Sequence, residues 1–197
     1  KRTDFTKNCM TCSSATRPGT AADQTRCSCF FKKMKILFIT NGHGEDMIAA
    51  RIMKELEGEE ISVLPVVGAG DVFDRMPVKV LGPRKKMPSG GFVYQSFTSL
   101  LKDVFSGLIG NSLDHIRILR SLKGHYDLTV AVGDIVPIIG AMLAGTKFFF
   151  VGCAKSYHYD YSYTPWERYF LKKYCSLCFP RDRKTFDALS KCGIKCV

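Results

Sequence analysis

The sequence predicts an α/β fold, in which a parallel sheet carries helices on both faces, and three observations support this prediction. Along residues 34–197, short apolar runs alternate with stretches whose apolar residues recur with helical spacing. Most of the runs are apolar throughout, as expected for strands that are covered on both faces. Four of them lead into loops that contain glycine and polar residues. Strands that alternate with helices in this way are typical of βαβ units and predict a Rossmann-like, doubly wound sheet.

Five apolar runs have the length of strands, and helical patterns lie between them. The strands are predicted at 34–40, 61–68, 127–134, 147–152 and 176–181, and the helices at 45–57, 97–122, 135–144, 165–174 and 182–192. Right-handed crossovers place the C-terminal ends of parallel strands along one edge, where such sheets bind ligands. The loops expected at this edge comprise residues 41–46, 68–71, 133–134 and 152–159.

The two ends of the chain differ from the middle. Residues 1–33 are rich in Ser, Thr, Lys and Arg and have no apolar period, so we expect a disordered or non-native leader there. This stretch lacks the continuous apolar core of a secretory signal. Residues 193–197 resemble the start of another strand after a helix. We therefore expect the 34–197 domain to be part of a larger protein.

Charge and cysteine usage limit the partners and the compartment. The formal net charge of the 197-residue chain is +11, which suits an anionic partner, either a phosphate-bearing ligand or a membrane surface. We expect no nucleic-acid partner. No uninterrupted apolar span of transmembrane length occurs, so no transmembrane helix is expected. Nine cysteines without a secretory signal favour a reducing compartment, and hence the cytoplasm or the inner face of its membrane.

Two groups of cysteines contain the Cys-x-x-Cys spacing found in many metal sites. In the first group, the spacing of Cys9, Cys12, Cys27 and Cys29 permits a zinc site without requiring one. In the second, Cys175 and Cys178 lie in an apolar strand, which favours small core residues over ligands. We therefore expect no metal site, with a zinc-binding regulator as an alternative function.

The stretch NGHGED (41–46) follows the first predicted strand and combines glycines, an imidazole and carboxylates. The glycines can adopt backbone angles closed to other residues and let a ligand approach closely. The amides that open the next helix can bind an anion, whereas its first-turn carboxylates could serve only to complement the helix dipole. The spacing does not match the dinucleotide fingerprint. We expect substrate binding by Asn41, Gly42, Gly44 and Glu45, and ligand binding or proton transfer by His43.

Asp134 is the second candidate, because it stands between an apolar strand and a predicted helix in AVGDIVP. A carboxylate at this place can be a general base with a raised pKa. It can also simply cap the following helix. Gly133 beside it opens space for a substrate.

The segment GCAKSYHYDYSYTPWERY (152–169) is dense in polar and aromatic groups. Lys155, Ser156 and Tyr157 offer the donors and stacking faces that bind sugars. Trp166 is expected to pack inward at a helix start. After the next strand, Arg181 is a candidate phosphate ligand, although an ion pair with the neighbouring Asp182 is an alternative.

Residues 84–122 combine a basic cluster, a Gly-Gly turn and a long amphipathic stretch. An ordinary core-facing helix would account for this pattern. The alternative is a surface that contacts anionic lipid through apolar side chains and adjacent cations. The residues expected on such a surface are Arg84, Lys85, Lys86, Phe92, Phe97 and Phe105.

Taken in order, LFITNGHGEDMIAARI, MPSGGFVYQS, AVGDIVP, FVGCAKSYHY, PWERY and FPRDRKTFDAL resemble the lipid-A-disaccharide synthase-related proteins. The resemblance extends over residues 34–197. The first loop differs from the Ser-x-Gly-Glu-x-Ser-Gly-Asp pattern usual in the disaccharide synthase itself. The related group is therefore the better match.

This resemblance implies a GT-B architecture, with two Rossmann-like domains and a cleft between them. Such enzymes are inverting and metal-independent, and they need no cofactor besides the nucleotide-sugar donor. The donor would bind mainly to a C-terminal domain absent from this sequence, and the lipid-linked sugar acceptor to the present one. The resemblance places the catalytic base at Asp134 and puts residues 42–45 near the acceptor and donor phosphates.

Two functions of different classes therefore remain open. In the first, the chain is the acceptor half of a glycosyltransferase and is inactive alone. In the second, it is a non-catalytic Rossmann-like module that binds an anionic lipid surface or a protein partner.

Overall fold

The structure is a computed structural model, and it describes residues 33–67, 69–82, 109–159 and 162–197. The expected leader, Arg84, Lys85, Lys86, Phe92, Phe97 and Phe105 lie outside these ranges. Side chains are likewise not described at His43 and at residues 109–114. The expectations made for these positions therefore stay predictions.

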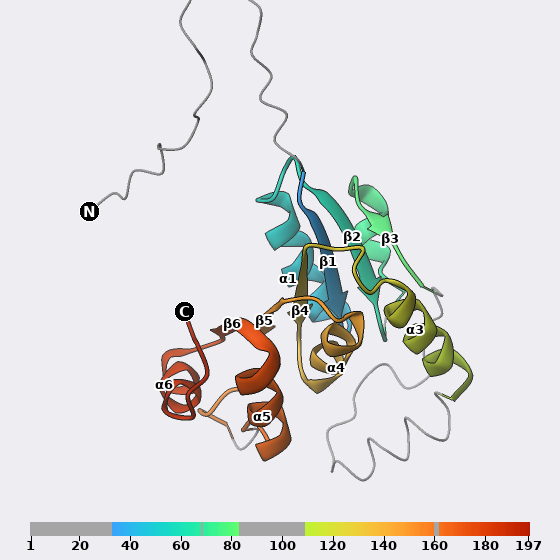
Figure 1. The fold of residues 1–197 in the computed structure, drawn as a ribbon. Coiled ribbons are helices and arrows are strands. Elements are labelled where there is room, and N and C mark those ends of the chain that lie inside the picture. Colours follow the sequence, from blue (N-terminus) through green and yellow to red (C-terminus); the bar gives the residue numbers. More distant parts are fainter. Residues whose placement is uncertain (1–32, 68, 83–108, 160–161) are drawn as a thin grey trace, which may run out of the picture. The chain divides into compact units, whose positions relative to one another are not determined.

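The described residues form a parallel sheet with helices on both faces, which confirms the predicted α/β, Rossmann-like fold (Figure 1). The strand order is β3-β2-β1-β4-β5-β6, and every neighbouring pair is parallel. The strands are β1 (Lys35–Thr40), β2 (Glu60–Pro65), β3 (Lys79–Val80), β4 (Leu128–Val132), β5 (Phe148–Gly152) and β6 (Cys175–Pro180). The helices are α1 (His43–Lys54), η1 (Asp71–Arg75), α3 (Ile109–Ser121), α4 (Ile135–Ala144), α5 (Pro165–Tyr174) and α6 (Arg183–Lys191).

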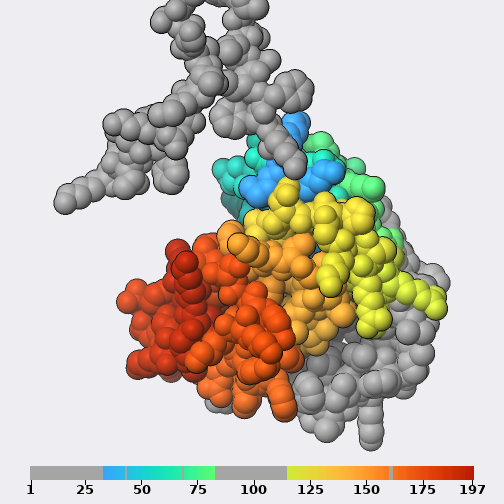
Figure 2. Space-filling view, viewed as in Figure 1, coloured from blue at the N-terminus to red at the C-terminus, as the bar shows by residue number. Residues whose placement is uncertain are grey.

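The alternating side chains of β1 show how the two faces are covered. Ile36 and Phe38 belong to one apolar cluster, which α1 and η1 complete, whereas Leu37 and Ile39 belong to the other, which α3, α4, α5 and α6 complete. Figure 2 shows the side of the molecule on which α3, α4 and α5 are visible. Because both faces of β1 are buried, its sequence has to be apolar throughout, as observed.

The predicted bounds of two helices coincide with the structure, and a side-chain cap precedes each of these two helices. The helices at 135–144 and 165–174 coincide with α4 and α5, which begin after the side-chain caps Asp134 and Thr164. The first helix begins at His43, two residues before the predicted start. Both β3 and η1 were missed, because two- and five-residue elements leave little periodic signal. The predicted strand start at 193–197 is represented by a parallel bridge between Cys178 and Cys196.

The strand order reverses between β1 and β4, which lie side by side in the middle of the sheet. Their register pairs Thr40 with Val132, and Val132 in turn with Val151 of β5. The strands therefore end level with one another, and the loops that follow leave the same edge. Ligands of open α/β sheets bind at such a topological switch point.

None of the helices formed by the described residues combines the length and the apolar character that a membrane span requires.

Candidate functional site

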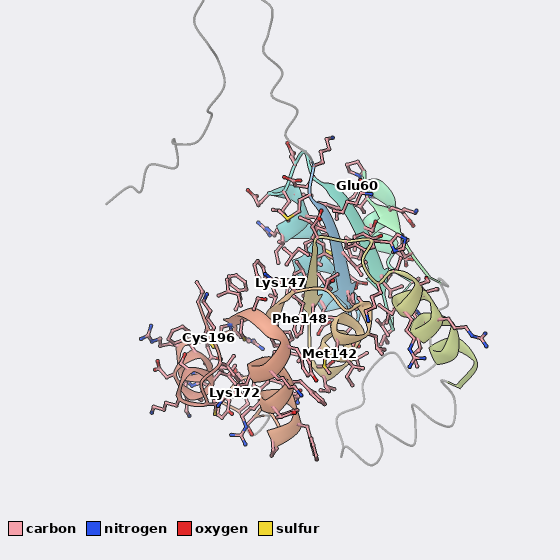
Figure 3. All side chains as sticks on the ribbon, viewed as in Figure 1. Glu60, Met142, Lys147, Phe148, Lys172 and Cys196 are labelled. Carbon is pink, nitrogen blue, oxygen red and sulfur yellow. The ribbon has the colours of Figure 1, made fainter. Side chains whose placement is uncertain are left out.

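The C-terminal edge of the sheet brings together loops that are far apart in the sequence. Asn41 and Gly42 follow β1, Gly133 and Asp134 follow β4, and Arg181 follows β6. Residues 153–157 follow β5 and contribute Lys155, Ser156 and Tyr157. Glu60 and Phe148, which are labelled in Figure 3, begin β2 and β5 at the opposite edge. The sequence-predicted residues described by the structure thus share one edge.

At Gly133 the loops after β1 and β4 approach each other closely. Its backbone has φ of 132°, and a Cβ placed on it would lie 3.1 Å from Glu45 Cγ and 3.2 Å from Asn41 Cβ. Gly42, by contrast, is extended with φ of 176°, and Gly44 lies inside α1 with nothing within 4 Å of its hypothetical Cβ. Gly42 and Gly44 therefore do not use the backbone angles that are closed to other residues, and their expected role in substrate binding stays a prediction. Of Gly42, Gly44 and Gly133, only Gly133 has a backbone angle and neighbours that both oppose a side chain.

These two environments predict opposite effects for the same substitution. Gly44→Ala should raise the free energy of unfolding by about 0.5–1 kcal/mol, because alanine favours the helix and has room. Gly133→Ala should lower it by at least about 1 kcal/mol, because its backbone angle and its neighbours both oppose a side chain. Urea unfolding of the two variants measures this. Equal effects would show that the β1 and β4 loops do not pack as described.

Asp134 caps α4, since its side chain accepts a hydrogen bond of 3.0 Å from the Val136 amide. The capping interpretation is confirmed, and the role of general base stays a prediction. Burial raises the pKa of this carboxyl above its ordinary 3.8, and the negative charges of Glu167 and Glu45 act in the same direction. The Val136 amide and the Lys155 ammonium offset the increase only in part. A raised pKa suits a group that exchanges protons.

A second cap, Asp182 at the start of α6, has the opposite electrostatics. Its carboxylate accepts hydrogen bonds from the Thr185 amide at 2.8 Å and the Thr185 hydroxyl at 3.0 Å. Desolvation alone would raise the pKa of Asp182, but hydrogen bonds from Ser156 and Thr185 outweigh it and lower the pKa below 3.8. The two capping aspartates therefore differ in the sign of their pKa shift.

This difference predicts opposite pH dependences of stability. The folded-state pKa of Asp134 is raised, so its contribution favours folding below pH 3.8 and is lost as the pH rises through the folded pKa. The folded-state pKa of Asp182 is lowered, so its contribution is present above pH 3.8 and is lost as the pH falls through the folded pKa. Relative to the wild type, Asp134→Asn should therefore become more stable with rising pH and Asp182→Asn less stable. Urea unfolding across the acid range tests both, and parallel curves would contradict the assignment.

Glu167, which was not among the residues predicted from the sequence, has a side chain that is only 1% exposed. Its Oε2 accepts hydrogen bonds from Lys155 Nζ at 2.7 Å and from the amide and hydroxyl of Thr164 at 2.8 and 2.9 Å. The contact from the Thr164 amide is half of a capping box at the start of α5, whose other half is the Glu167 amide donating to Thr164 Oγ1 at 3.3 Å. The Thr-x-x-Glu spacing of Thr164 and Glu167 was the available signal. Glu167 therefore ties the Lys155 ammonium to the first turn of α5.

Several buried polar atoms in this region have no hydrogen-bond partner among the described residues. They are the Asn41 Oδ1, the Glu167 Oε1 and the hydroxyl of Tyr163. Tyr163 is buried, its ring packs against Phe150 and Tyr157, and its hydroxyl lies against Gly152 at the end of β5. Buried groups of this kind usually bind water or ligand. Their concentration at one edge supports a binding site there.

The ion pair between Lys155 and Glu167 predicts that Lys155 stabilises the fold, in addition to placing a positive charge at the candidate site. Lys155→Met leaves the Glu167 carboxylate buried without its cation and should lower the free energy of unfolding by about 2–3 kcal/mol. This range is reduced because the Lys155 side chain is 23% exposed. Thr164→Ala removes the cap and the hydroxyl contact with Glu167 but leaves the Lys155 ion pair in place, and it should cost about 1 kcal/mol. Chemical denaturation distinguishes the two, and equal losses would mean that the ion pair adds nothing.

Ser156 and Tyr157 are held within the protein framework. Ser156 is buried, its hydroxyl donates to Asp182 and its Oγ accepts from the His158 amide at 3.0 Å. The Tyr157 amide donates to Thr185 Oγ1 at 2.9 Å, and the Tyr157 ring is partly buried. These contacts join the loop after β5 to α6, so both residues are placed to shape the site.

Cys153 and Arg181 lie at the same edge of the sheet, after β5 and β6. Burial, with the nearby charge of Glu45, raises the pKa of the Cys153 thiol to about 12, so it is a poor nucleophile. The exposed Arg181 donates from Nη1 to the Cys153 carbonyl at 3.4 Å.

Trp166 was expected to pack inward, but it is 60% exposed, so that expectation is wrong. Its neighbour Glu167 points inward instead.

The described residues contain no group of three or more His, Cys, Asp and Glu side chains that could hold a metal ion. Comparison with known proteins finds no matching family model and no matching curated protein.

Proposed function

We propose that the chain is the acceptor-side domain of an inverting GT-B glycosyltransferase related to lipid-A-disaccharide synthase. In this proposal a sugar moves from a nucleotide-sugar to a lipid-linked or glycolipid acceptor, and a second domain binds most of the donor. Support comes from the sequence resemblance over residues 34–197 and from the Rossmann-like sheet. The single observation that carries it is Asp134, a half-buried carboxyl with a raised pKa at the switch point.

In the proposed reaction, Asp134 accepts the proton of an acceptor hydroxyl while that oxygen attacks the anomeric carbon. The bond from this carbon to the nucleoside diphosphate breaks, and the electron pair leaves with the diphosphate. A base with a pKa closer to the working pH transfers protons more effectively than an ordinary aspartate. Positioning and stabilisation of the leaving-group charge would supply most of the remaining rate.

Two cations and one helix N-terminus could stabilise the negative charge of the leaving nucleoside diphosphate. Lys155 is held by Glu167 near Asp134, and Arg181 is exposed at the end of β6. No side chain caps the N-terminus of α1 at Gly42, in contrast to α4, α5 and α6. The amides of that first turn are suited to a phosphate oxygen. We therefore assign the α1 terminus to the diphosphate.

The general-base assignment predicts that Asp134→Asn lowers turnover of the complete enzyme by at least about a hundredfold. Asparagine still caps a helix well, so the fold and the substrate KM should change little. The measurement is transfer of labelled sugar from nucleotide-sugars into lipid, with circular dichroism as the control for folding. A near-normal rate would remove Asp134 from the mechanism and make His43 the next candidate.

The alternative function is a non-catalytic module that binds anionic lipid or a protein partner. The capping role of Asp134 is the observation that favours it, since capping alone would explain this residue. Absence of transfer by the complete protein with every nucleotide-sugar tested, together with retained lipid or partner binding, would support this alternative.

A further inference from the structure

Helix α5 exposes large aromatic side chains to solvent. Trp166 is 60% exposed, Tyr169 50% and Tyr174 42%. Trp166, Tyr169 and Lys173 share one face of the helix, because they are spaced by three and four residues. Clusters of exposed apolar surface usually mark an interaction site. The buried residues of α5 are Glu167 and Leu171, so the exposed face is not needed for packing against the sheet.

The exposed face of α5 is also basic. Lys172 and Lys173 are exposed, and Figure 3 labels Lys172 on this helix. Lys173 Nζ contacts the Tyr169 hydroxyl at 3.1 Å and lies 5.4 Å and 5.1 Å from the ring centroids of Tyr169 and Tyr174. The acidic residue of α5, Glu167, is buried and paired with Lys155. The side of α5 that faces solvent therefore carries positive charge without compensating acids from the helix itself.

This combination fits the surface of a lipid bilayer better than another protein. Tryptophan and tyrosine are enriched where a bilayer meets water, and lysine stems extend along apolar surface while the ammonium reaches the headgroups. Protein interfaces also favour aromatic residues, but they are depleted in lysine. Anionic headgroups complement the lysines.

We propose that the exposed face of α5 docks on an anionic phospholipid bilayer through Trp166, Tyr169, Lys172 and Lys173. The first turn of α5 is joined to the proposed site by the 2.7 Å contact between Glu167 and Lys155. Docking would therefore bring the C-terminal edge of the sheet close to the bilayer, from which a lipid-linked acceptor could enter. The entry of the acceptor rests on the proposed function, whereas docking itself does not.

Trp166 is the single tryptophan of the chain, so its fluorescence reports on α5 alone. On addition of vesicles of phosphatidylcholine and phosphatidylglycerol, its emission should move to shorter wavelength, and brominated acyl chains should quench it. Vesicles of phosphatidylcholine alone should give a much weaker response. Cosedimentation would be less specific, because basic residues elsewhere in the chain also bind anionic vesicles.

A matched pair of charge reversals tests the contribution of α5. The double variant Lys172→Glu with Lys173→Glu should weaken partitioning at least about tenfold, because two attractions become repulsions. The control is Lys184→Glu with Lys191→Glu, which changes the net charge equally at two exposed positions of α6. Its response should resemble the wild type. Circular dichroism checks the fold of each variant.

Three results would overturn docking by α5. The first is unchanged Trp166 emission with anionic vesicles. The second is an equal loss for both charge-reversal variants, which would indicate attraction by net charge alone. The third is an emission shift that follows protein concentration without vesicles and accompanies dimer formation in sedimentation velocity, which would assign the face to a second copy. Vesicle docking without sugar transfer would contradict the proposed function and leave docking established.

Discussion

The parallel pairing of β1 with β4 is the interaction on which the candidate site depends. This pairing reverses the strand order and brings Asn41 and Glu45 against Gly133, although about ninety residues separate the two loops. Parallel pairing with β2 and β4 holds β1 in register, and successive side chains of β1 alternate between the apolar clusters on the two faces. The position of Asp134 relative to α1 thus depends on strand pairing and on hydrophobic packing of the sheet, away from the candidate site itself.

Buried charge is the second constraint at this edge. Removing a carboxylate from water is unfavourable, and Glu167 is tolerated because Lys155 and Thr164 bind its Oε2. Asp134 has one amide donor and a partly compensating cation, and its pKa remains raised. Two acids within the same region are therefore stabilised to different extents. Glu167, whose charge is compensated by more hydrogen-bond donors, has a structural role. Asp134, whose charge is compensated less, is the better candidate for proton transfer.

Sequence patterns predicted the sheet and most helices because burial on both faces and capping leave strong local signals. The apolar runs located five of the six strands, and Asp134 stood directly before the predicted start of α4. Contacts between distant segments left no such signal. Gly133 requires glycine because of its positive φ and because Glu45 and Asn41 lie against it, and the residues beside Gly133 in the sequence do not reveal these two contacts. Glu167 could have been found from its capping box, but its pairing with Lys155 depends on where the loop after β5 lies.

The first turn of α5 shows how one short segment can serve two surfaces. Trp166 and Glu167 are adjacent, and a helix turns about 100° per residue, so one side chain faces solvent while the other is buried. Glu167 is bound to Lys155, whose charge acts on Asp134. Contact of Trp166 with a lipid surface would therefore involve the first turn of α5, which also contains Glu167, the partner of Lys155. Lipid docking and the cation beside the proposed base would then depend on the same helical turn.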